Sequence, residues 1–230
     1  MTLIYDQACD LVRKVYEKRI DGPPILDLNS HFPNARRFTD SWRIIRDEAL
    51  VIARRLDSVP RFHEVMPEQA SISSHDDRDW RTFILKAYGL ENPGNMMRCP
   101  ALASILRETP EVLSATISFL APRKHVPRHR GPFRGVLRFH LGLSMPSAAD
   151  GRPAAVLKIG DREHRISNGD CLLWDDTYPH EVWNASDDVR IALLLDVWRP
   201  DMPIDMQLLS KFLVAIVQVG VKYRGVACRS

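Results

Sequence analysis

The second half of the chain carries short apolar runs at regular intervals. Turn residues such as Gly160-Asp161 and Asn168-Gly169-Asp170 separate these runs. Many short strands with regular turn signals between them are typical of a β-sandwich or a β-barrel. The five predicted strands are 113–120, 136–143, 154–159, 171–174 and 190–197.

Other parts of the chain show helical periodicity, with apolar positions three and four residues apart. The predicted helices are 3–19, 38–56, 100–109 and 201–221. A length of 230 residues suits one domain. We therefore predict a single domain over residues 1–230 that is mainly β with flanking helices. In it, 1–111 is largely helical, 112–200 forms the β core with the functional site, and 201–230 forms a C-terminal helix.

The composition excludes several classes of protein. Hydrophobic residues make up 45% of the chain and charged residues 27%, which are ordinary values for a soluble globular protein. A net charge of +3 is too small to indicate a nucleic-acid binder. No run reaches the ~18–20 apolar residues of a membrane span, and Asp6 and Asp10 interrupt any signal peptide. The sequence predicts a cytoplasmic protein with no transmembrane segment.

The four cysteines, Cys9, Cys99, Cys171 and Cys228, lie far apart and form no Cys-x-x-Cys pair. This spacing argues against a disulfide framework and against a structural zinc site, and it favours a reducing compartment.

The predicted strand 136–143 has one polar face. Alternate residues of a strand point to opposite sides, so four apolar residues share one face, while Arg138, His140 and Gly142 lie on the other with Val136. A cation, an imidazole and a residue without a side chain suit the lining of a small anionic site.

A second polar segment supplies the complementary groups. His180 follows Pro179 at the end of a strand, and Arg190 begins an almost wholly apolar strand ten residues later. An unpaired buried charge is costly, so Arg190 must face water or bind an anion, typically a carboxylate through two parallel hydrogen bonds. Two imidazoles and an arginine are the groups that a non-haem iron site binding a 2-oxo acid requires.

These segments resemble the aspartyl/asparaginyl β-hydroxylase family, which also includes bacterial hydroxylases of lipid A acyl chains. The resemblance covers roughly residues 26–200 and is carried chiefly by His140-Leu141-Gly142-Leu143, the stretch 175–184 and the stretch 190–200. It implies a double-stranded β-helix (jelly-roll, cupin-like) core. It also implies iron(II), 2-oxoglutarate as cosubstrate and O2-dependent hydroxylation of an unactivated carbon.

The same resemblance implies roles for individual residues. His140 and His180 match the iron ligands, and Arg190 matches the residue that binds the 2-oxoglutarate carboxylate. Asp176, four residues before His180, matches a position that supports the iron-bound water. The resemblance further implies that His129 and Arg138 line the cosubstrate pocket.

Gly142 occupies the position at which a facial triad of iron ligands places its carboxylate, two residues after the first histidine. Some iron oxygenases with this position vacant bind halide and chlorinate their substrate. The remainder of the match favours hydroxylation over halogenation.

The sequence leaves the substrate open. An aspartyl or asparaginyl residue, or another small acid, is the first expectation; a lipid acyl chain and a secondary metabolite are alternatives. A protein of a different class, a non-catalytic cupin-like module that binds a metal or a small acid, would share the fold. The apolar face of 201–221 suits packing on the barrel, a dimer contact or peripheral contact with a membrane. The oligomeric state is likewise left open.

Overall fold

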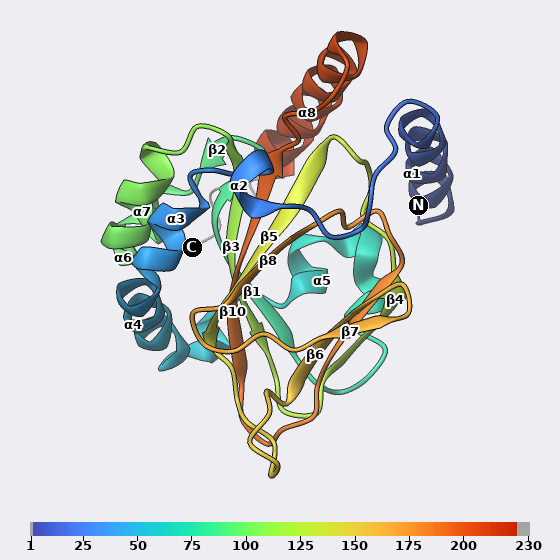
Figure 1. The fold of residues 1–230 in the computed structure, drawn as a ribbon. Coiled ribbons are helices and arrows are strands. Elements are labelled where there is room, and N and C mark those ends of the chain that lie inside the picture. The colour runs from blue at the N-terminus through green and yellow to red at the C-terminus, as the bar shows by residue number, and fades with distance from the viewer. Residues whose placement is uncertain (1, 225–230) are drawn as a thin grey trace.

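The computed structural model describes residues 2–224, and the side chains of residues 5–221. Within these residues, ten strands form two sheets (Figure 1). The six-stranded sheet has the order β2 (Leu90–Glu91), β1 (Trp80–Ala87), β3 (Val112–Leu120), β10 (Arg190–Trp198), β5 (Val136–Ser144) and β8 (Cys171–Trp174). The four-stranded sheet has the order β4 (His125–His129), β9 (His180–Asn184), β6 (Ala155–Ile159) and β7 (Arg162–His164).

The eight strands from β3 to β10 form a jelly roll. β3, β5, β8 and β10 belong to one sheet, β4, β6, β7 and β9 belong to the other, and all pairings between them are antiparallel. The chain therefore crosses repeatedly between two facing sheets, which is the double-stranded β-helix arrangement. The predicted fold class is confirmed.

Helices cover the outer face of the six-stranded sheet. Residues of these helices share one buried core with residues of the sheet, among them Phe38, Ile45, Leu106, Ile117 and Leu193. The opposite face of the sheet is therefore available to line a functional site. The helices that contribute to this core are α2 (Leu28–His31), α3 (Ala35–Asp40), α4 (Trp42–Ala53), α6 (Pro93–Arg98) and α7 (Pro100–Arg107), with the 3₁₀ turn η1 (Leu56–Ser58). The remaining helices are α1 (Thr2–Glu17), α5 (Phe62–Val65) and α8 (Ile204–Arg224), with the 3₁₀ turn η2 (Pro67–Ile72).

The sheets include five strands that the sequence did not predict as strands, namely β1, β2, β4, β7 and β9. β1 lies inside the part predicted to be largely helical, and it pairs with β3 from Trp80 to Lys86. β4 holds His129 and β9 begins with His180, and neither segment was predicted as a strand. The predicted helix 38–56 divides into α3 and α4 at Ser41. Cys9, Cys99 and Cys171 are free thiols, and Cys228 lies outside the described residues.

Helix α8 extends beyond the end of the sheets (Figure 1). Leu209 and Leu213 pack against the core, but Leu208, Phe212 and Ile216 are exposed, so the predicted single apolar face is divided between core and solvent. The segment Ile204–Val221 has a mean hydropathy of 1.6 and is only 17% buried. By length and composition it could cross a membrane, so the expectation that no stretch reaches this length was wrong. Residues 225–230 lie outside the described residues.

A fully buried lysine ties a surface loop to the β3–β4 connection. Lys124 Nζ donates to Ser73 O at 2.6 Å and forms an ion pair with Asp76. Burial alone would raise the pKa of Asp76, but the hydrogen bond and the charge of Lys124 outweigh burial and lower it. The pair therefore stabilises the folded state when Asp76 is ionised.

We expect Asp76→Ala to lower the free energy of unfolding by about 2–3 kcal/mol, because it leaves a buried ammonium without its counter-ion. The stabilisation is present above about pH 4, the unfolded-state pKa of an aspartate, and is lost as pH falls through the lower folded-state pKa. Urea denaturation at pH 7 and at pH 3.5 measures both effects. Asp187→Ala, which removes the exposed partner of Arg123, should change stability by less than about 1 kcal/mol. Equal losses in the two variants would contradict the prediction.

Candidate active site

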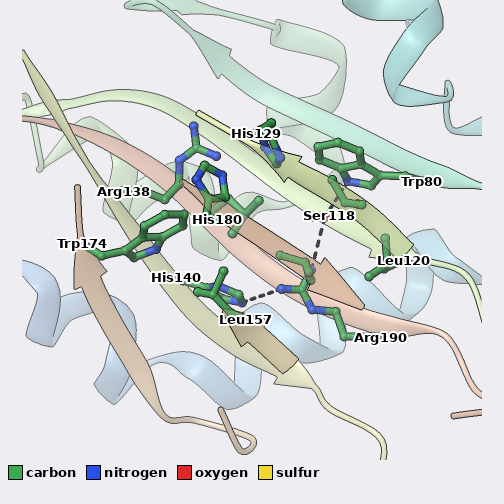
Figure 2. A pocket seen from close by; sticks show the side chains of 13 residues that line it. Trp80, Ser118, Leu120, His129, Arg138, His140, Leu157, Trp174, His180 and Arg190 are labelled. Atoms are coloured by element: carbon green, nitrogen blue, oxygen red, sulfur yellow. Dashed lines mark hydrogen bonds between the residues drawn. The ribbon is translucent and has the colours of Figure 1, made fainter. Parts of the chain in front are cut away.

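Five of the six side chains singled out in the sequence line one cavity between the two sheets (Figure 2). The cavity has a volume of about 50 Å³. Its polar lining consists of Ser118, His129, Arg138, His140, His180 and Arg190. The sixth predicted residue, Asp176, forms an ion pair with Arg138 at 3.0 Å. The structure therefore brings together predicted residues that are up to 61 positions apart, from His129 to Arg190.

His129 and His180 form a cross-strand pair. They lie opposite each other on β4 and β9, and their ring centroids are 4.1 Å apart. Each ring bonds through Nδ1 to the carbonyl two residues earlier, at 2.8 Å to Pro127 O and 2.9 Å to Tyr178 O. With Nδ1 as the donor, Nε2 of each ring keeps its lone pair for a ligand. Backbone carbonyls commonly orient metal-binding histidines in this way.

Both rings are held in the neutral form that a metal requires. Burial lowers the pKa of His129 to about 4 and lowers that of His180 well below its ordinary value. Neutral imidazole nitrogens are good ligands for iron and related metals. The donor set of this pair therefore fits a metal ion.

Arg190 is a buried cation whose partners carry no negative charge. Its guanidinium donates from Nη2 to His140 Nε2 at 2.6 Å and from Nη1 to Ser118 Oγ at 3.5 Å, as the dashed lines in Figure 2 show. Its Nε has no partner in the described part of the chain. Burial lowers the pKa of Arg190 to about 10, so it stays charged at neutral pH. A carboxylate in the cavity would satisfy this charge with two parallel hydrogen bonds.

Arg138 connects the cavity to two carboxylates. Its Nη2 lies 3.0 Å from Asp176 Oδ2 and its Nε donates to Asp196 Oδ1 at 2.7 Å. Burial raises the pKa of Asp176 to about 7 despite the charge of Arg138. A Cβ at Gly131 would lie 2.0 Å from Asp176 Oδ1. Glycine at this position therefore allows the carboxylate to approach the backbone two residues after His129.

One further polar residue of the cavity, Ser118, was missed in the sequence. Ser118 is buried on β3, where it contacts Arg190 and accepts a hydrogen bond from Trp80 Nε1 at 3.0 Å. Phe62 stacks on Trp80 with ring centroids 3.9 Å apart. A single serine in an apolar strand is a weak sequence signal for a site residue. Had β1 been predicted as a strand, its pairing with β3 would have placed Trp80 beside Ser118.

His129 and His140 have different partners in the structure, which the sequence did not predict. His129 pairs with His180, whereas His140 Nε2 accepts a hydrogen bond from Arg190. The predicted ligand pair was His140 and His180, with His129 in the cosubstrate pocket. In the structure, His129 bonds to a backbone carbonyl through Nδ1 and keeps Nε2 free for a ligand, whereas Nε2 of His140 is bonded to Arg190.

Gly142 has a packing role. A Cβ there would lie 2.3 Å from the carbonyl oxygen of Ser167, which is backbone and cannot move aside easily. The absence of a carboxylate at this position therefore follows from a close approach of two segments. Among the described residues, no group of three or more His, Cys, Asp and Glu side chains could hold a metal.

Residues 39–200 match the family model described as aspartyl/asparaginyl beta-hydroxylase. The chain belongs to this family. The resemblance stated from the sequence is thus confirmed, and the matched residues include every strand of the two sheets and every residue of the cavity.

Two relatives show the range of the family. An ornithine lipid ester-linked acyl 2-hydroxylase from Rhizobium tropici is 32% identical over 182 residues, which are 79% of this chain and 63% of that protein. The human aspartyl/asparaginyl beta-hydroxylase is 27% identical over 167 residues, which are 70% of this chain and 20% of that protein. The chain thus spans less than two thirds of either relative.

Solved structures are more distant. A predicted oxalate decarboxylase from Thermotoga maritima matches 55% of this chain and 89% of its own, with 13% identity and a TM-score of 0.36. The fold assignment rests on the strand order of the two sheets.

Proposed function

We propose that this protein is an iron(II)- and 2-oxoglutarate-dependent oxygenase that hydroxylates an unactivated carbon. The observation that supports it best is the pairing, in one cavity, of two histidines with free Nε2 atoms and a buried arginine without an anionic partner. Family membership supports the same reaction class.

In this proposal His129 and His180 hold the metal through Nε2, and Arg190 binds the distal carboxylate of 2-oxoglutarate. His140 and Ser118 hold the guanidinium of Arg190 in place. Iron(II) with 2-oxoglutarate and O2 supplies the oxidising power for hydroxylation, releasing succinate and CO2. The assignment exchanges the roles that the sequence gave to His129 and His140.

Arg138 and Asp176 complete the proposed site. Asp176 can hold a water molecule beside the metal position, because its carboxylate lies against the backbone two residues after His129. Arg138 fixes that carboxylate through their ion pair. Trp80, Leu157 and Trp174 line the same cavity and exclude bulk water.

Succinate formation from 2-oxoglutarate tests the proposal. Purified protein with iron(II) and O2 should produce succinate, and His180→Ala should not. A panel of aspartyl peptides, amino acids and acyl lipids then identifies the substrate class by its acceleration of turnover. If protein shown to bind iron forms no succinate with any of them, the non-catalytic metal-binding module is the better description.

A further inference from the structure

A second and larger cavity lies between helices α1 and α8. Its volume is about 420 Å³, within the range typical of small-molecule sites. Apolar side chains from both helices line it, including Val12, Leu213, Ile216 and Val217. The polar side chains that border it are Tyr5, Cys9, Glu68 and Tyr88. The hydroxyl of Tyr5 accepts a hydrogen bond from Gln69, and burial raises its pKa to about 12. Most of the lining is apolar, which favours a hydrocarbon.

A row of residues connects this cavity to the active site. Tyr88 lines the cavity and donates its backbone N–H to Ser114 Oγ at 3.1 Å. Ser114 lies opposite Asp196 on the next strand, and Asp196 lies opposite Arg138. Directly opposed residues share one face of a sheet, so the row ends at the arginine that lines the metal cavity.

The backbone at Tyr88 is held in an unusual conformation. Tyr88 has φ of +50° and Gly89 has φ of +84°, and together they form the two-residue turn between β1 and β2. A tyrosine seldom adopts this conformation, which persists where its surroundings fix it. Gln218 of α8 donates to Tyr88 O at 2.7 Å. Helix α8 thus holds the residue at which this row meets the larger cavity.

The large cavity also adjoins an apolar surface. Ile216 lines the cavity and is 53% exposed. On the same side of α8, Leu208, Phe212 and Val219 are exposed at helical spacing. The lining of the cavity is therefore continuous, at Ile216, with an exposed apolar surface of α8.

We propose that the cavity between α1 and α8 binds the hydrocarbon chain of a lipid substrate. The proposal rests on the proposed oxygenase function and names the class of substrate for that site. An extended peptide would leave its backbone amides without partners against these side chains, which is costly, whereas an alkyl chain gains about 0.8 kcal/mol for each CH₂ group buried. The relative from Rhizobium tropici that acts on a lipid acyl chain supports the same class.

A fluorescent fatty acid, 11-(dansylamino)undecanoic acid, tests the site directly. The probe is titrated into iron(II)-loaded protein with 2-oxoglutarate and without O2, so no turnover occurs. Wild type should bind it saturably. Ala8→Trp fills the cavity from α1 and should weaken binding about tenfold or more, the equivalent of roughly two buried CH₂ groups. Gln7→Trp, on an exposed neighbouring position outside the lining, should bind like wild type.

A second pair of variants controls for loss of binding through misfolding. Ile216→Asn places a polar group in the lining and should weaken binding, whereas Phe212→Asn changes the exposed face of the same helix and should not. Absence of saturable binding to wild type, or equal binding by all four variants, would overturn the proposal. Because the probe is read without turnover, a failed succinate assay on wild type refutes the oxygenase function separately.

Discussion

Alanine in place of His129 should abolish iron binding, whereas alanine in place of His140 should leave iron bound and weaken the binding of 2-oxoglutarate. His129 presents a free Nε2 beside His180, but Nε2 of His140 is occupied by Arg190. We expect turnover in His129→Ala to fall by more than about 100-fold, because loss of a residue that merely supports a ligand already costs about 10–100-fold. In His140→Ala the KM for 2-oxoglutarate should rise by roughly 10–100-fold.

Iron retained per chain after anaerobic loading and desalting, measured with ferrozine, separates the two roles. His125→Ala is the matched control, since His125 lies on the same strand but pairs with Glu181 outside the cavity. It should retain iron like wild type. Loss of iron from His140→Ala together with retention by His129→Ala would restore the ligand pair predicted from the sequence.

Replacing Arg190 with methionine should weaken 2-oxoglutarate binding by roughly 30- to 4,000-fold. Removing one partner of a buried, hydrogen-bonded charge pair costs about 2–5 kcal/mol, and Arg190 is 3% exposed. Arg190→Lys should recover only part of the loss, because an ammonium keeps the charge but not the two parallel hydrogen bonds. Isothermal titration of 2-oxoglutarate into the iron(II)-loaded protein without O2 measures the effect.

Arg123→Met provides the comparison, since Arg123 is an exposed arginine paired with Asp187 on the surface. It should bind 2-oxoglutarate as wild type does. Unchanged affinity in Arg190→Met would mean that the distal carboxylate lies elsewhere.

Much of the fold was predictable because most strands of the jelly roll are apolar and bounded by turn residues. Alternation in β5 placed Leu137 and Phe139 in the core and Arg138 and His140 in the cavity, and the structure confirms both faces. The apolar start of β10 likewise pointed to Arg190 as a residue that needs an anion.

The pairing of histidines was not predictable from local pattern. β4 has the sequence His-Val-Pro-Arg-His, in which a proline and an arginine hide a strand. Proline is tolerated there because β4 is at the edge of its sheet. Only the register of β4 against β9 brings His129 to His180. β1 was missed for a related reason, since Arg81 and Lys86 interrupt its apolar run.

Helix α8 shows a different limit of prediction from the sequence. Its segment is apolar on nearly all sides, so periodicity alone could not select the side that packs. Leu209 and Leu213 face the core because Met202, Met206 and Val214 pack with them. Leu208, Phe212 and Ile216 belonged to the predicted apolar face as well, but they are exposed.

The position of β4 at the sheet edge has a consequence for the lifetime of the bound metal. One proposed ligand lies on this edge strand, which pairs only with β9 within its sheet, while the other lies on β9 itself, between two neighbours. Edge segments open locally at a lower free energy than the whole domain. Metal dissociation would then proceed through fraying of β4, at a rate set by local opening. Bound metal should slow hydrogen–deuterium exchange at the amides of β4 more than at those of β6.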